Sequence, residues 1–156
     1  MFEGLAMEVG VFVDATSPYF DAVAYVPGHQ PTISDLEHFQ ERVSNIDIWV
    51  ADGRRLLDRI IEFERTLSAD VAGYGSRISD PDAQSDLVDW VNVAMNWPVL
   101  DLRQTLSDYL DDLRLLYGSA VSAADQVAAD IERQAWEASA RSMRPSGLRL
   151  VGAVSC

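Results

Sequence analysis

Three aspartates, Asp108, Asp111 and Asp112, form a DxxDD cluster on one predicted helix. Carboxylates in such a cluster can hold Mg²⁺ against a diphosphate substrate. That chemistry needs a second acidic cluster across a deep cavity, and the sequence contains no second motif of this kind. We therefore interpret the three carboxylates as the solvated acidic face of a helix and predict no metal site.

A second group of residues has the one-three-five-seven spacing of a calcium-binding loop: Asp80, Asp82, Gln84 and Asp86. The match fails at both diagnostic positions, because Ser85 stands where glycine is needed and Val91 stands where a bidentate glutamate is needed. We expect Asp80 to cap a helix instead, with Pro81 as the first helical residue.

The two histidines, His29 and His38, lie outside any serine, cysteine or zinc motif and are expected at the surface. The Glu-x-x-His spacing of di-iron bundles is also absent from the sequence. The sequence therefore predicts no catalytic residue and no bound cofactor.

Glu64 interrupts an otherwise apolar helical seam. A buried carboxylate must be paired or protonated. We expect either an arginine of the second long helix, such as Arg103 or Arg114, or an open edge of the core to satisfy it.

Four arginines gather on the polar side of the first long helix: Arg54, Arg55, Arg59 and Arg65. Acids three or four residues away, such as Asp52, would form helix-surface pairs worth about 0.3–0.5 kcal/mol each. The cluster is either a solvated face or a docking patch for an acidic partner or a second copy, with Arg54 and Arg55 as candidate contacts.

Aromatic residues supply the other candidate contacts, because they are enriched in interface hot spots as well as in cores. Trp97, directly before Pro98, is the candidate interface anchor. Trp90 and Phe63 have the same two interpretations, whereas Trp49 is expected in the core.

These residues require two long helices to position them. The first begins at Ser34, whose side chain forms a capping box with Glu37, and ends at Gly73 and Gly75. Its seam advances in steps of three and four: Leu36, Phe39, Val43, Ile46, Val50, Gly53, Leu57, Ile60, Glu64, Leu67 and Val71. Apolar residues flank this seam, and the resulting wide face favours a bundle over a two-stranded coiled coil.

The second long helix follows a connection over residues 76–97, where Pro98 predicts a kink or restart at Trp97. Its seam has the same spacing: Leu102, Leu106, Tyr109, Leu113, Leu116, Ala120, Ala124, Val127 and Ile131. Seam side chains are mostly small after Gly118, which allows close approach of another backbone. We expect the two helices to pack as an antiparallel hairpin.

Both ends of the chain are expected to be extended. Residues 1–31 contain two β-like runs, 9–13 and 20–26, and predict a hairpin or arm. Residues 145–156 predict a strand or extended arm that pairs with this hairpin or with a neighbouring subunit. The expected fold is mainly α, a long antiparallel helical hairpin or bundle over residues 32–144 between these two ends.

The amino-acid composition limits which classes of partner the protein can bind. The 156 residues include 25 Asp plus Glu, 12 Arg and no Lys, for a net charge of −13. Phosphate binding depends on clusters of basic residues, so we expect no direct nucleic-acid partner and no anionic membrane partner. No run approaches the roughly 20 apolar residues of a membrane span. A secretory signal begins with basic residues, and here none precedes Arg42. We expect a cytoplasmic protein, or part of a particle assembled in the cytoplasm.

The charge is unevenly distributed. Residues 80–117 contain eight Asp and two Arg, a net charge of −6. No acid follows Glu137, whereas Arg141, Arg144 and Arg149 do. The basic tail is therefore expected to contact the acidic body of its own chain or that of a neighbour.

These observations favour a non-enzymatic protein that binds other proteins, as a structural or assembly component of a multi-subunit complex such as a viral particle. Its partners would be copies of itself or other proteins. The alternative is an acidic inhibitor, of the immunity type or mimicking DNA, that binds a basic site on another protein. An enzyme with an unrecognised site is the third hypothesis.

Overall fold

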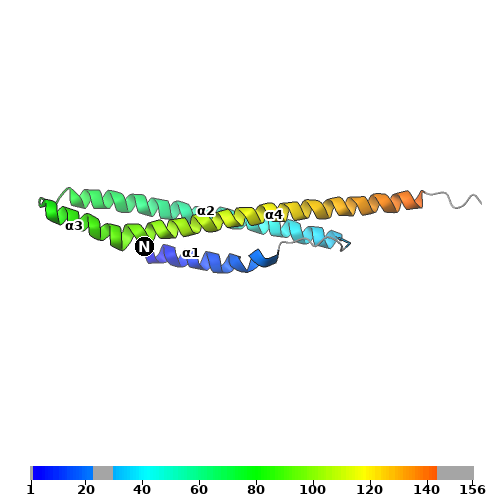
Figure 1. The fold of residues 1–156 in the computed structure, drawn as a ribbon, viewed down its shortest axis with the longest axis horizontal. Helices are drawn as coiled ribbons and strands as arrows, with labels where there is room; N and C mark the ends of the chain where they lie inside the picture. The colour runs from blue at the N-terminus through cyan, green and yellow to red at the C-terminus, as the bar shows by residue number, and fades with distance from the viewer. Residues whose placement is uncertain (1, 23–29, 144–156) are drawn as a thin grey trace, which may run out of the picture.

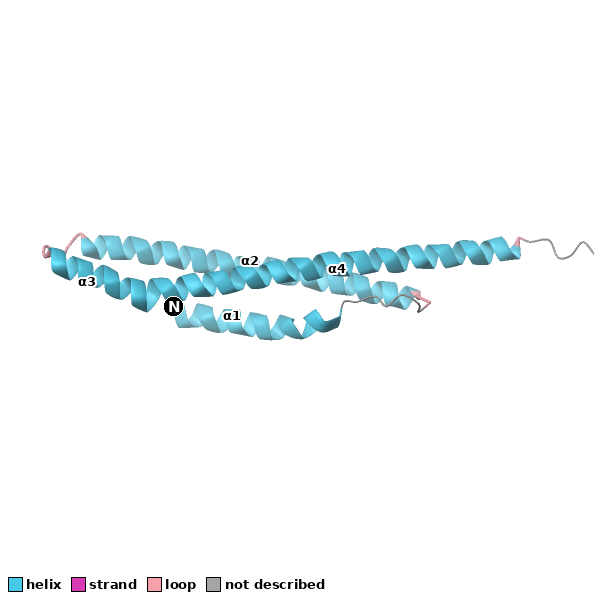
Figure 2. Cartoon of the chain, in the orientation of Figure 1, coloured by secondary structure: helices cyan, strands magenta, loops and turns pink. Residues whose placement is uncertain are grey.

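The computed structural model describes residues 2–22 and 30–143, which form an elongated helical bundle (Figures 1 and 2). Its elements are α1 (Phe2–Thr16), the 3₁₀ helix η1 (Ser17–Ala22), α2 (Ile33–Gly75), α3 (Pro81–Val91), the π-helical turn η2 (Asn92–Asn96) and α4 (Trp97–Ser142). α2 and α4 run antiparallel and pack on each other, and α1 packs against both (Figure 1). The predicted helical hairpin is thus confirmed, with α1 as a third long helix.

The core follows the two predicted seams. Every seam position of α2 and α4 is buried or half-buried. The main cluster of buried side chains draws on both helices and on α1: Leu5, Val9, Ile46, Val50, Ile60, Val99, Leu106, Leu110, Leu113, Leu116 and Ala120. The small seam residues after Gly118, Ala120 and Ala124, are buried as well, and so is Val127, which is 0% exposed.

The predicted N-terminal β-hairpin is wrong where the structure describes it. Residues 9–13 lie inside α1, and Phe20 lies in η1. The alternating run is short, whereas Leu5, Val9 and Thr16 recur at helical spacing and are the buried residues of α1. Burying that face outweighs the strand preference of the valines. Residues 23–26 of the second predicted strand, and the predicted C-terminal strand or arm at 145–156, lie outside the described residues.

The predicted cap of the first long helix is displaced by two residues. Thr32, not Ser34, is the N-cap residue, and its hydroxyl accepts from the Asp35 amide at 3.2 Å. The Asp35 carboxylate in turn accepts from the Thr32 amide at 2.7 Å, which completes a capping box. Thr32 and Asp35 have the same i, i+3 relation as Ser34 and Glu37, so they can form the same kind of capping box. By beginning earlier, the helix also gains the hydrogen bond from the Leu36 amide to the Thr32 carbonyl.

A π-helical turn joins α3 to α4 without breaking the helix. Asp80 caps α3 and accepts from the Asp82 amide at 3.1 Å, with Pro81 at the first turn as predicted. In η2 the Trp97 amide donates to the Asn92 carbonyl, five residues back. Pro98 has no amide to donate and its ring crowds the preceding turn, so the wider turn lets it occupy a helix. In place of the predicted kink or restart at Trp97, the structure has this π-helical turn just before it.

Three helices meet at Gly53. A Cβ atom at this position would lie 2.5 Å from Leu110 Cδ2 on α4 and 3.0 Å from Phe12 Cζ on α1. Leu110 is only 1% exposed, so its side chain has little room to move. The absent side chain therefore permits the close approach of α1 and α4 to α2.

The Gly53→Ala variant should lower the free energy of unfolding by about 1–2 kcal/mol. Overpacking costs about 1–3 kcal/mol, which exceeds the roughly 0.5–1 kcal/mol that alanine gains over glycine inside a helix. Gly118→Ala is the matched control, since nothing lies within 4 Å of its Cβ position, and it should stabilise the protein. Urea denaturation followed by circular dichroism measures both. Equal shifts in the two variants would contradict a tight crossing at Gly53.

Candidate interaction surface

A polar and aromatic cluster fastens α1 to the hairpin. The Tyr109 ring on α4 packs edge-on against Phe12, with centroids 5.9 Å apart, and lies 5.5 Å from the ring of Phe20. The buried Thr16 hydroxyl donates to the Phe12 carbonyl at 2.9 Å. The Thr16 hydroxyl also forms a hydrogen bond with the Tyr109 hydroxyl, in which either group can donate. The sequence placed Tyr109 on a seam but gave no sign of this partner.

The other end of α1 is held by charge and by an aromatic contact. The Glu8 carboxylate accepts two hydrogen bonds from the Arg59 guanidinium on α2, and these lower the pKa of Glu8 below its ordinary value. The Phe2 ring stacks on Phe63, with centroids 6.2 Å apart. Phe63 is half-buried against the core, which decides between its two interpretations.

The carboxylate on the seam has the predicted partner. Arg103 of α4 donates to Glu64 of α2 at 2.7 Å. Arg114, the other arginine considered for this role, pairs instead with Asp111 on its own helix. The Arg103 and Glu64 side chains are 38% and 34% exposed, so the pair contributes no more than about 1 kcal/mol. Because Arg103 donates to it, the Glu64 carboxylate can lie on the seam with a hydrogen-bond partner.

Stability should fall at alkaline pH because of Tyr109. Burial raises the pKa of the Tyr109 phenol, Asp112 raises it further, and the hydrogen bond to Thr16 partly offsets both. The folded state thus holds the proton more tightly, so its stabilisation is complete below the unfolded-state pKa of about 10 and is lost as pH rises through the folded-state pKa.

Thermal unfolding from pH 8 to 11 measures this loss. Tyr109→Phe should flatten the alkaline decline, whereas Tyr74→Phe, at a residue 62% exposed, should leave it in place. A decline of the same size in both variants would show that Tyr109 is not its source.

The residues considered for metal chemistry do not form a site. Asp108 accepts from Gln104 at 2.7 Å, Asp111 pairs with Arg114, and both aspartates and Asp112 are exposed. Among residues 2–22 and 30–143, no group of three or more His, Cys, Asp or Glu side chains could hold a metal ion. His38 is exposed, whereas His29 lies outside the described residues.

The arginine cluster of α2 is largely engaged within the chain. Arg55 pairs with Asp52 at 2.7 Å, and Arg65 pairs with Glu62 at 2.6 Å. Arg54 is exposed. Three of the four arginines thus serve helix-surface or interhelical pairs, as a solvated face would. Arg149 lies outside the described residues.

Four apolar side chains form a stripe on the outer surface, which we call the α3–α4 stripe: Trp90, Val93, Trp97 and Leu100. These side chains are 64%, 60%, 64% and 46% exposed. They recur every three or four residues through α3, η2 and α4, and so lie along one side of a continuous helix. Trp97 and Leu100 also line a shallow groove with Pro98, Asp101 and Gln104. The predicted interface anchor is thus exposed and has three apolar neighbours.

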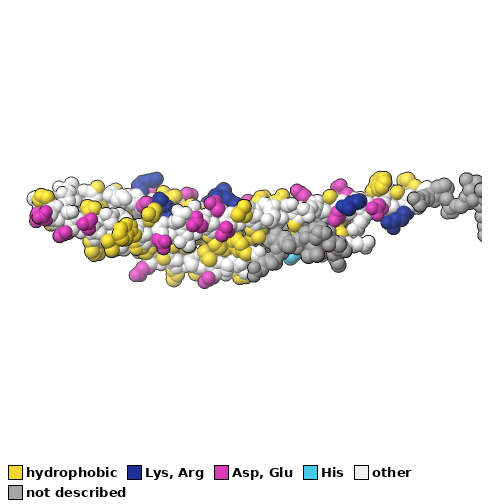
Figure 3. All heavy atoms as spheres, viewed as in Figure 1, with side chains coloured by type: hydrophobic (Ala, Val, Ile, Leu, Met, Phe, Trp, Pro, Cys, Tyr) yellow, Lys and Arg dark blue, Asp and Glu magenta, His cyan; other side chains and the backbone are white. Residues whose placement is uncertain are grey.

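Acidic residues accompany the stripe. Asp86 and Asp89 lie four residues before Trp90 and Val93, and Asp101 lies four residues after Trp97. All three aspartates are exposed, and none forms an ion pair with another described residue. Figure 3 shows apolar and acidic side chains together over α3 and the start of α4.

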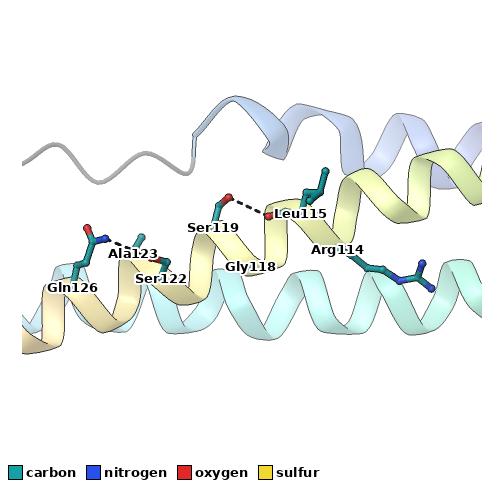
Figure 4. Close-up of a pocket in the computed structure, with 7 residues that line it drawn as sticks. All are labelled: Arg114, Leu115, Gly118, Ser119, Ser122, Ala123 and Gln126. Carbon is teal, nitrogen blue, oxygen red and sulfur yellow. Dashed lines mark hydrogen bonds between the residues drawn. The ribbon is translucent and has the colours of Figure 1, made fainter.

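A second groove runs along α4 alone (Figure 4). Its lining residues are Arg114, Leu115, Gly118, Ser119, Ser122, Ala123 and Gln126. Ser119 donates to the Leu115 carbonyl at 3.1 Å and Gln126 donates to Ser122 at 3.4 Å, so these polar groups are satisfied within the helix. The lining comes from a single helix and brings no reactive groups together.

The C-terminal end of α4 projects beyond the N-terminal end of α2 (Figure 1). Every residue from 135 to 143 is exposed, and Trp136 and Met143 are 72% and 77% exposed. Arg141, beside them, pairs with Glu137 at 3.2 Å. This end therefore presents apolar side chains and one arginine–glutamate pair, at the far end of the rod from the α3–α4 stripe.

Comparison with known proteins finds no matching family model, no matching curated protein and no matching solved structure. Across the described residues, the helices lack an apolar stretch long enough to cross a membrane.

Proposed function

We propose that this chain is a non-enzymatic assembly subunit, a structural component of a multi-subunit complex such as a viral particle built in the cytoplasm. It acts through protein–protein contacts. The observation that carries the proposal is the α3–α4 stripe, where two tryptophans stand more than half exposed beside Val93 and Leu100.

Leaving such a stripe in contact with water is unfavourable in free energy. Isolated apolar side chains are normal on a protein surface, whereas contiguous ones mark binding sites. Tryptophan is enriched at the energetic centre of interfaces, and a polar rim around it is typical. The exposed residues Asp86, Asp89 and Asp101 supply such a rim.

The solution mass tests the proposal. Size-exclusion chromatography with light scattering, over a range of protein concentrations, should give a mass well above the 17.3 kDa of one chain. A concentration-dependent mass would indicate a weak subunit contact, as expected for an interface of modest area. A mass of one chain at every concentration would contradict self-assembly.

The acidic surface supports a second candidate function, an inhibitor that binds a basic site on another protein. Asp101, Asp108 and Asp112 are exposed along α4 and continue the acidic rim of the stripe. Such a surface would speed association with a positively charged cleft and make binding sensitive to salt.

Nuclease assays test this second candidate. The protein should slow DNA cleavage by a nuclease with a basic active-site cleft at low salt, and the effect should fade at high salt. Replacing Asp108, Asp111 and Asp112 together by Asn should abolish the inhibition. Replacing Asp14, Asp47 and Asp70 by Asn removes the same charge from exposed positions elsewhere and is the control. Equal inhibition by both triple variants would contradict the acidic-site interpretation.

A further inference from the structure

We propose that copies of this chain associate head to tail, with the C-terminal end of α4 and residues 144–156 of one copy bound to the α3–α4 stripe of the next. This inference rests on the proposed assembly function and names the contact that builds it. Three observations identify the C-terminal end of a second copy as the partner of the stripe: the charges of the two segments, the length of residues 144–156, and the positions of the two surfaces on the rod.

Charge opposes the simplest alternative, in which two stripes pack on each other. Each stripe lies in the segment 80–117, whose net charge is −6. In a two-fold interface the same patch of both copies is buried, so the acidic rim of one stripe would meet the acidic rim of the other. Like charges placed opposite each other disfavour such a contact, so the stripe suits an apolar partner that carries positive charge.

The C-terminal end of the chain has that composition. Trp136 and Met143 are exposed apolar side chains in the described part, and Arg141 between them pairs with Glu137. Beyond them the sequence contains Arg144 and Arg149 within an apolar run and has no acidic residue. Trp136 and Met143 offer apolar groups for the stripe, and Arg144 and Arg149 offer guanidinium groups for its acidic rim.

The tail cannot reach the stripe of its own chain. α4 has 46 residues, so Trp97 and Ser142 are separated by about 68 Å along the helix. Residues 144–156 span at most about 47 Å even if fully extended. Contact between tail and stripe therefore requires a second copy.

The two surfaces lie at opposite ends of the rod (Figure 1), so a contact between them joins two different surfaces of neighbouring copies. Binding one copy's tail leaves that copy's stripe open for another. Such a heterologous contact produces a ring if the rotation closes and a filament if it does not.

A mixing experiment tests the contact. The stripe variant carries Trp90→Ala and Trp97→Ala. The tail variant lacks residues 144–156 and carries Trp136→Ala and Met143→Ala, so that it loses both parts of the C-terminal surface. Each variant alone should have the mass of one chain, because each has lost one of the two surfaces. An equimolar mixture should give a discrete species of two chains, because one intact tail then meets one intact stripe. Leu115→Ala is the control, since Leu115 is 72% exposed away from the stripe and its loss should not change the wild-type mass.

The outcomes separate this inference from the proposed function. If the wild type assembles and the stripe variant retains that mass, the head-to-tail contact is overturned while assembly stands. A tail variant that still dimerises, or a mixture that stays monomeric, also overturns it. A wild type that is monomeric at all concentrations overturns both proposals. Circular dichroism of each variant checks folding, and the charge reversal Asp86→Arg with Asp89→Arg, which spares both tryptophans, should also prevent assembly.

Discussion

The apolar faces of α2 and α4 are wider than two helices can bury against each other, and the other elements cover different parts of that width. In the middle of the rod α1 provides the cover, with Leu5 and Val9 entering the core. Its close approach depends on Gly53, where α2 offers no side chain to α1 or α4. At the two ends, where α1 does not extend, large apolar side chains stay exposed: Trp90 and Trp97 at one end, Trp136 and Met143 at the other.

Polar groups set the position of α1 along this surface. Apolar packing alone permits sliding, because one leucine fits where another did. The hydrogen bond between Thr16 and Tyr109 fixes the C-terminal end of α1, and the ion pair between Glu8 and Arg59 fixes its middle. The Glu64–Arg103 pair gives the same kind of directional contact between α2 and α4. These contacts add modest energy and define one register.

The same molecule separates charge along its length. Five of its aspartates lie in residues 80–101, from the α3 cap to the start of α4, and that segment has no arginine. At the other end of the sequence, no acid follows Glu137, whereas Arg144 and Arg149 do. The two segments therefore differ in charge, and the exposed apolar side chains in each add short-range attraction. Together these features favour ordered association over random aggregation.

The sequence by itself determined the two long helices, their seams and the Asp80 cap, and it offered an arginine of the facing helix as one of two ways to satisfy Glu64. The helices and seams follow from periodicity over dozens of residues, where one burial pattern outweighs local preference. It also placed a candidate contact at Trp97, although the core and surface interpretations stayed open. Only the tertiary structure decided that residues 9–13 are helical, because their β-branched composition fits either state until α2 and α4 provide a surface to bury them. It likewise decided that Phe63 packs inward while Trp90 and Trp97 face outward, since α1 covers Phe63 and no described helix covers the tryptophans.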